Sequence, residues 1–148
     1  MSLTNVFEIA GSGMNAQSIR INTTASNIAN ADSASSSVDE TYRARKPWFA
    51  VMQNAMLTPD KNNQFQTRTD QIGHGVQVLG IVEKDAPWQA RFQPDHPMAN
   101  EDGYVYYPNV NIVEEMTDMM SSSRSYQMNV EVLKTAKQML QRTLMLGQ

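Results

Sequence analysis

The stretch NIVEEMTDMMSSSRSYQMNVEVLKTAKQMLQRTLML, residues 111–146, decides the fold. Residues recur in it at alternating steps of four and three, the spacing of one helix face, and this stripe is mostly apolar. The stripe comprises Ile112, Met116, Met119, Ser123, Tyr126, Val130, Leu133, Lys137, Leu140 and Leu144. Asn111 and Glu114 have the spacing of a capping box, and acids precede bases along the segment, which suits the helix macrodipole. The pattern predicts a long helix over residues 109–146, with Gly147 as its stop signal.

A second stripe with the same steps occupies the first thirty residues. It comprises Leu3, Phe7, Ala10, Met14, Gln17, Ile21, Thr24 and Ile28, and it predicts a helix over residues 3–28. Gly11 and Gly13 each weaken such a helix by about 1 kcal/mol relative to Ala. Two interpretations of these glycines stay open. They mark a frayed or broken helix end, or they are small residues that let a neighbouring backbone approach closely.

The lengths of the two predicted helices bear on function. The helix predicted at residues 109–146 would be about 57 Å long, whereas a compact globule of this size has a diameter of about 40 Å. The helix predicted at residues 3–28, at about 40 Å, covers only part of the longer apolar stripe. The rest of that stripe needs other chains. We therefore expect the terminal helices to pair as an elongated coiled coil that serves as an assembly device.

The residues between the helices predict a small, irregular, β-containing region. Residues 31–41 are rich in Ser, Ala and Asp and predict a loop. The other predicted features are an interrupted or edge strand at 42–52 that contains Pro47, a long loop at 58–75, a strand at 76–82, and an irregular run at 87–108 with a short strand at 104–107. The fold class is mainly α with a β-rich insert. The predicted parts are an N-terminal assembly helix (1–30), a small outer region (31–108) and a C-terminal assembly helix (109–148).

Composition excludes several classes of function. The formal net charge of −3 gives no basic surface for nucleic acid. The chain has no cysteine, hence no disulfide framework or thiolate nucleophile. No window is apolar for the ~18 residues that a membrane span needs. The first ten residues lack the charged and apolar regions of a cleavable signal, so the protein stays in the cytoplasm or leaves by a route that reads no cleaved signal.

No residue pattern predicts catalysis, a cofactor or a metal site. His74 lies between glycines and His96 between prolines, as in turns, and neither has the spacing of a metal signature. Trp48, Phe49, Trp88 and Phe92 flank Arg45 and Arg91, which is compatible with base stacking but, in an acidic region, favours a small core with cation–π partners. We expect no enzyme.

Three stretches together resemble one family. ASNIANADS, residues 25–33, resembles the motif that closes the N-terminal helix of flagellar rod and hook proteins. NIVEEM (111–116) and SRSYQMNV (123–130) resemble their C-terminal helix. PDHPMANEDGYVYYPNV, residues 94–110, is similar to the hallmark of one member. The resemblance covers roughly residues 1–33 and 76–148, and this combination is specific to the flagellar basal-body rod family.

The resemblance implies a structural subunit that the flagellar type III export apparatus secretes without signal cleavage. It implies helical stacking in the periplasm with copies of itself and other rod proteins, without nucleic acid or a membrane span. The terminal helices would line a hollow axial shaft of the basal body that transmits torque. The expected assembly interface comprises Leu3, Phe7, Met14, Ile21, Asn27, Ile28, Asn30, Ile112, Met116, Met119, Tyr126, Val130, Leu133, Leu140 and Leu144.

Two other classes of function stay open. A soluble coiled-coil adaptor or export chaperone would bind a few partners in the cytoplasm and would form a discrete dimer with protected termini. The other class is an enzyme with an unrecognised site. Termini that are disordered in the dilute monomer favour the polymer.

Overall fold

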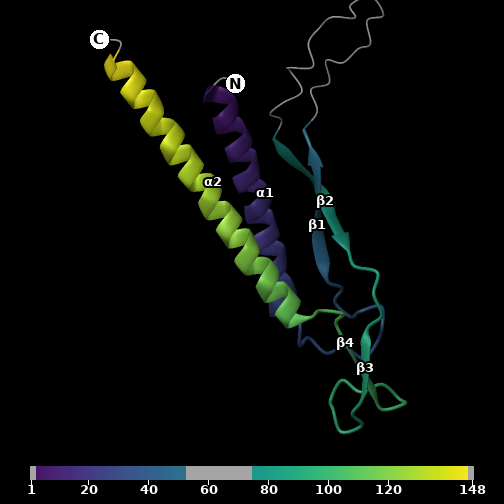
Figure 1. The fold of residues 1–148 in the computed structure, drawn as a ribbon. Coiled ribbons are helices and arrows are strands. Elements are labelled where there is room, and N and C mark those ends of the chain that lie inside the picture. Colours follow the sequence, from purple (N-terminus) through teal and green to yellow (C-terminus); the bar gives the residue numbers. More distant parts are fainter. Residues whose placement is uncertain (1–2, 53–74, 147–148) are drawn as a thin grey trace, which may run out of the picture.

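Two long antiparallel helices and two small β pairs make up the molecule. One β pair lies beside the first helix, and the other lies beyond one end of the helix pair (Figure 1). The structure is a computed structural model that describes residues 3–52 and 75–146. Helix α1 spans Leu3–Ala29 and helix α2 spans Ile112–Leu146. The start of α1 and the end of α2 lie at the same end of the helix pair (Figure 1). Neither helix is long and apolar enough to cross a membrane.

Both predicted helices are confirmed, with one shift at a boundary. Helix α2 begins at Ile112 rather than at residue 109, because Asn111 caps it. The Asn111 side-chain oxygen accepts hydrogen bonds from the backbone N–H groups of Val113 (3.1 Å) and Glu114 (3.4 Å). Its 35 residues make α2 about 52 Å long. Gly147, the predicted stop signal, lies outside the described residues.

The glycines of α1 differ from each other. Both lie inside a continuous helix, so the interpretation as a frayed end is wrong. A Cβ atom at Gly13 would come within 2.9 Å of the Asn129 side-chain nitrogen, whereas one at Gly11 would meet nothing within 4 Å. The close approach predicted for small residues therefore occurs at Gly13, and its partner is a side chain of α2 rather than a backbone.

The β region consists of two antiparallel hairpin-like pairs. Strand β1 (Arg45–Val51) pairs with β2 (Val76–Glu83), and the register is irregular after Trp48. Strand β3 (Gln89–Phe92) pairs with β4 (Tyr104–Tyr107). The strands at 42–52, 76–82 and 104–107 and the loop after α1 are confirmed. Strand β3 was not predicted, because four exposed residues between proline-containing segments carry no strand pattern of their own. Most of the loop predicted at 58–75 lies outside the described residues.

Small side chains form most of the buried interior. Ala10 and Ala16 of α1 and Ser122 and Ala136 of α2 are buried. In the β region Val105 is fully buried, and Ala31, Ala44 and Val110 form a cluster against Tyr42. The close contact of the helices follows from these small residues, because large side chains would hold the two axes further apart.

The aromatic core predicted from the sequence is wrong for two of its four rings. Trp48 and Phe92 are 61% and 63% exposed. The predicted cation–π contacts do exist, and Trp88, Arg45 and Arg91 take part in them. The guanidinium carbon lies 4.4 Å from the ring centroid in the Arg43–Trp88 pair and 4.6 Å in the Arg91–Tyr107 pair, and the longest such contact, at 5.5 Å, joins Arg45 to Tyr42. The arginines stack on aromatic rings at the edge of the small β pairs because these pairs are too thin to bury a large ring.

Candidate assembly interface

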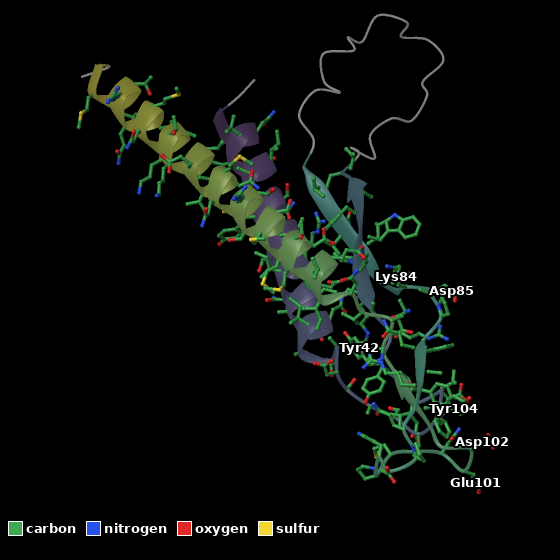
Figure 2. The ribbon with its side chains drawn as sticks, turned by 60° about the horizontal axis from the view of Figure 1, so that its bottom comes forward. Tyr42, Lys84, Asp85, Glu101, Asp102 and Tyr104 are labelled. Carbon is green, nitrogen blue, oxygen red and sulfur yellow. The ribbon has the colours of Figure 1, made fainter. Side chains whose placement is uncertain are left out.

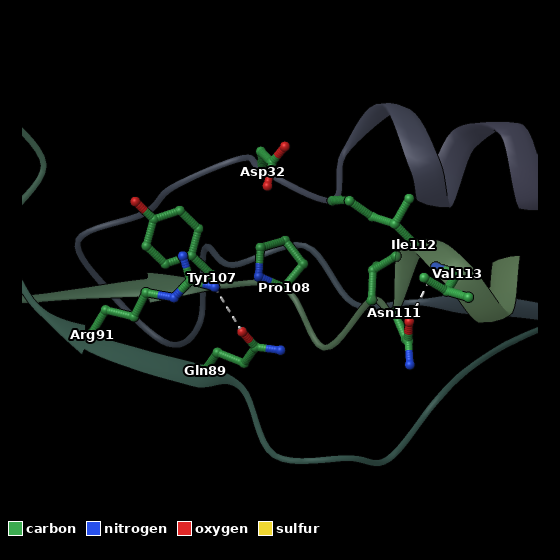
Figure 3. A pocket seen from close by; sticks show the side chains of 10 residues that line it. Asp32, Gln89, Arg91, Tyr107, Pro108, Asn111, Ile112 and Val113 are labelled. Atoms are coloured by element: carbon green, nitrogen blue, oxygen red, sulfur yellow. Dashed lines mark hydrogen bonds between the residues drawn. The ribbon is translucent and has the colours of Figure 1, made fainter. Parts of the chain in front are cut away.

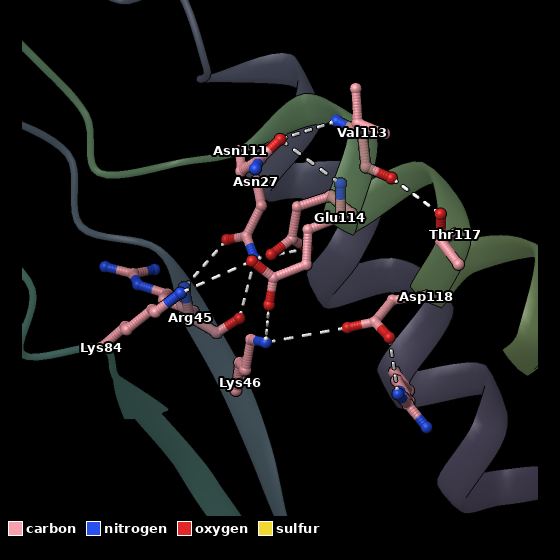
Figure 4. Close-up of polar contacts among 11 residues, drawn as sticks. Asn27, Arg45, Lys46, Lys84, Asn111, Val113, Glu114, Thr117 and Asp118 are labelled. Carbon is pink, nitrogen blue, oxygen red and sulfur yellow. Dashed lines mark hydrogen bonds and ion pairs between the residues drawn. The ribbon is translucent and has the colours of Figure 1, made fainter.

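Asn27 joins α1, β1 and α2 at the junction of the helices with the strands (Figure 4). Its side chain is fully buried and makes four hydrogen bonds. The amide nitrogen donates to the backbone oxygen of Arg45 (2.8 Å) and to the Glu115 carboxylate (3.0 Å). The amide oxygen accepts from the Arg45 N–H and the Tyr42 hydroxyl, both at 2.9 Å. The two donors and two acceptor positions of the amide are all used, so Asn27 holds the subunit itself together.

A charged cluster lies next to Asn27 on the more exposed side (Figure 4). The Lys46 ammonium lies 2.9 Å from the Glu114 carboxylate and 3.7 Å from that of Asp118. Asp118 also pairs with Arg20 of α1 at 3.0 Å, and Lys84 lies 3.7 Å from Glu114. The hydrogen bond with Glu114 raises the pKa of Lys46, and the same bond lowers the pKa of Glu114. The cluster fixes the start of α2 against α1 and β1.

Asn30 and Asn109 organise the loops around this junction. The Asn30 side chain donates to the backbone oxygen of Ser26 (2.8 Å) and so closes the end of α1. Asn109 accepts from the Ala44 N–H (2.8 Å) and donates to the backbone oxygens of Lys84 and Ala86 (3.0 and 2.9 Å). Asn109 was not among the predicted site residues. The signals for it were its place in the stretch 94–110 and its position between a strand and a helix.

The loops of the β region carry exposed charged residues. Figure 2 shows Lys84 and Asp85 after β2, and Glu101 and Asp102 at the far end of the turn between β3 and β4. His96 lies in the loop after β3, where its Nδ1 accepts a hydrogen bond from the Met98 N–H at 3.1 Å. In the described parts of the chain, no three His, Cys, Asp or Glu side chains are placed to hold a metal ion.

At the opposite end of the helix pair, an apolar groove follows the seam between α1 and α2. Its volume is about 300 Å³, and Phe7, Met14, Val130 and Leu133 supply its apolar lining. All four are predicted interface residues, and the two from α1 are far in the sequence from the two of α2. Lys134 and Lys137 also line the groove. The structure therefore brings part of the predicted stripe of each helix into one surface, which the subunit fills only partly.

The other predicted interface residues fall into two groups. Met119, Leu140, Ile21 and Ile28 are half-buried between or beside the helices. Exposed on the outer surface of α2 are Ile112, Met116, Tyr126 and Leu144. Leu3 begins α1, and its side chain lies outside the described residues.

The predicted stripe of α2 is not the face that α1 buries along the first half of the helix. There the buried residues are Glu115 and Ser122, one position away from Met116 and Ser123. The predicted stripe and the face that α1 buries coincide further on, at Leu133 and Leu140. A helix turns 100° per residue, so the one-residue offset leaves the side chain of Met116 exposed to solvent.

Further exposed apolar residues were missed. On the β1–β2 pair they include Trp48, Val51, Leu79, Ile81 and Val82, and on α2 they include Met120, Met128, Met139 and Met145. The strand pattern of residues 76–82 and the eleven methionines were the signals for them. Large apolar side chains are therefore exposed on both regions.

Comparisons with known proteins identify the family. The family described as "Flagella basal body rod protein" matches residues 7–34, and the one described as "Flagellar basal body rod FlgEFG protein C-terminal" matches residues 101–146. "Flagellar basal-body rod protein FlgC" of Salmonella typhimurium is 43% identical over 148 residues, and that of Yersinia enterocolitica is 44% identical, each over the whole of both chains. The protein of the same name from Borreliella burgdorferi is 34% identical over 97% of both chains. The chain belongs to the flagellar basal-body rod protein family.

Proposed function

We propose that this chain is a structural subunit of the bacterial flagellar basal-body rod. The observation that carries the proposal is the match to FlgC rod proteins along the whole chain at 43–44% identity. The matches include both helices, which supply the groove and the exposed stripe. The comparisons give no support to an adaptor or export chaperone, and the names of the relatives imply a structural protein rather than an enzyme.

The two terminal helices are the proposed means of assembly. Soluble monomers rarely expose contiguous apolar surface beyond a few hundred Å². In this chain Met116 and Leu144 are 54% and 69% exposed, and the groove at Phe7 and Leu133 is only partly filled. Neighbouring subunits would cover these residues. The exposure of these apolar residues supports an elongated assembly in which the helices form a continuous inner layer.

We propose the finer features of this function from the resemblance to rod proteins. The assembly is a hollow axial shaft in the periplasm that transmits torque, made with copies of this chain and other rod proteins. The subunit reaches it through the flagellar type III export apparatus without cleavage of a signal. Intact-mass measurement of the protein in purified basal bodies tests this route, because loss of an N-terminal peptide of about twenty residues, a typical signal length, contradicts it.

A matched pair of substitutions on α2 tests the assembly surface. Leu133→Asp places a charge in the groove, and Gln138→Asp places the same charge at an exposed position of the same helix. We expect Leu133→Asp to abolish swimming in soft agar while the protein is still exported, and Gln138→Asp to swim normally. Circular dichroism of the purified variants checks that both keep their helices. Normal swimming of Leu133→Asp contradicts a role of the groove in assembly.

A further inference from the structure

The C-terminal end of α2 projects beyond the start of α1 (Figure 1). The antiparallel register places Asn27 beside Glu115 and Gly13 beside Asn129. On this register Leu3, the first residue of α1, lies opposite about residue 139 of α2. Residues 141–146, about one and a half helical turns, therefore extend past the described part of α1. We call this segment the overhang.

The overhang exposes two large apolar side chains and one cation. Leu144 and Met145 are 69% and 79% exposed. Arg142 is exposed and has no ion-pair partner among the described residues. The C-terminal end of a helix also carries a partial negative charge from the aligned peptide dipoles. A partner for the overhang must therefore offer apolar surface together with a carboxylate and a cation.

A recess with these features lies at the opposite end of the helix pair (Figure 3). Its volume is about 430 Å³, and it is formed where the loop after α1, strands β3 and β4 and the start of α2 meet. Pro108, Ile112 and Val113 supply the apolar part, and Val113 is 73% exposed. Asp32 lies on one side of the recess and Arg91 on the other (Figure 3).

The two charged residues of the recess have no ion-pair partner among the described residues. Asp32 has no ion-pair partner in the described part of the chain. The Arg91 guanidinium donates to the Gln89 side-chain oxygen (3.1 Å) and stacks on Tyr107, but it meets no carboxylate among the described residues. Both charges remain available to an incoming segment.

We propose that the overhang of one copy of this chain binds in the recess of a second copy. Leu144 and Met145 would cover Ile112 and Val113 of the neighbour, and Arg142 would pair with Asp32. The negative end of α2 would face Arg91. This inference rests on the proposed function as a rod subunit, and it specifies which surfaces of successive subunits meet.

The positions of the two surfaces exclude a contact within one subunit. They lie at opposite ends of α2, which is about 52 Å long. The contact is heterologous, because the overhang and the recess are different surfaces. A heterologous contact that does not close on itself generates an open helical assembly. One interface of this kind therefore suffices to stack copies along an axis.

Cysteine cross-linking in assembled basal bodies tests the contact, because the native chain has no cysteine. The test variant carries both Met145→Cys and Val113→Cys, and the control carries Val132→Cys and Val113→Cys. Val132 is an exposed residue in the middle of α2. A disulfide forms only between cysteines whose Cα atoms lie within about 7 Å. We expect a disulfide-linked dimer of this chain from the test pair after oxidation, and none from the control pair.

A charge exchange added to the test pair identifies the partner residue. Arg142→Asp or Asp32→Arg alone should abolish the dimer band, and the two together should restore it, since each contact then regains opposite charges. A dimer that persists in both single variants overturns the Arg142–Asp32 pairing. Assembled basal bodies in which the test pair gives no disulfide-linked dimer, or gives a cross-link to a different rod protein, overturn the inference while the proposed function stands. A native chain that is absent from basal bodies overturns both.

Discussion

The two ends of the helix pair are held in different ways. At the end that joins the strands, Asn27 and Glu115 are buried and every polar group of the Asn27 side chain has a partner. At the other end, contact depends on apolar side chains such as Phe7 and Leu133, which line an open groove, and α2 continues past α1. Hydrogen-bonded contacts determine a single geometry, whereas open apolar surface accepts a further helix. The first end maintains the shape of the subunit, and the open apolar surface of the second end supports its proposed role in assembly.

The largest effect is expected at the buried junction. Asn27→Ala removes four hydrogen bonds and leaves the Glu115 carboxylate buried without its donor, which should lower the free energy of unfolding by about 3–5 kcal/mol. Thermal unfolding followed by circular dichroism measures this loss. Asn22→Ala, at an exposed position of the same helix, is the control and should change stability by less than about 0.5 kcal/mol. Equal stability of the two variants would refute the role given to Asn27.

A smaller effect is expected in the groove, and none in the overhang. Leu133 is half-buried, so Leu133→Ala should lower the free energy of unfolding of the monomer by about 1–2 kcal/mol, below the range for a fully buried leucine. Leu144→Ala should leave it unchanged within about 0.5 kcal/mol. Both variants should reduce incorporation into basal bodies, which quantitative immunoblotting measures. A monomer that loses stability through Leu144→Ala would show that the overhang is already covered in the subunit.

The two glycines of α1 sharpen the comparison within one helix. Gly11→Ala should raise the free energy of unfolding by about 0.5–1 kcal/mol, because alanine favours the helix and its Cβ meets nothing within 4 Å. Gly13→Ala should lose this gain, because the new Cβ displaces the Asn129 side chain. Urea unfolding of both variants measures the difference. An equal gain at both positions would mean that α1 and α2 do not approach closely at Gly13.

The smallest effect is expected from the exposed ion pair of Lys46 and Glu114. Both side chains are about half exposed, so solvent screening limits the pair to less than about 1 kcal/mol. The pKa of Glu114 is lowered from its ordinary value of 4.5, so the stabilisation is present above that value and is lost as pH falls through the lower pKa of the folded state. The pKa of Lys46 is raised, so Lys46 stays charged throughout this range.

The measurement for this pair is the pH dependence of unfolding. Glu114→Gln should be less stable than the native chain at neutral pH, and the difference should disappear as the solution is acidified through the lowered pKa of Glu114 in the folded state. Glu101→Gln, in the exposed turn between β3 and β4, is the control. A difference that grows on acidification would contradict the lowered pKa.

Local signals in the sequence predicted most of the elements. The steps of four and three located both helices, and the spacing of Asn111 and Glu114 located the cap of α2. The partner of Glu114 was not predictable from that motif. Its carboxylate lies 2.9 Å from Lys46, which is 68 residues away in the sequence. The motif ASNIANADS was recognised by resemblance, and the hydrogen bonds of Asn27 supply a physical reason for an asparagine at that position.

The sequence by itself determined where helices form, because helical periodicity and capping depend on residues within a few positions of one another. It also determined that the helices carry more apolar surface than one subunit can bury. Only the tertiary structure decided which face of α2 meets α1. Small and polar residues such as Ser122 occupy that face, because the helices approach closely and a buried polar group is tolerated where a partner is positioned for it. The larger apolar residues then remain on the outside, where hydrophobicity alone does not distinguish a private core from a surface between subunits.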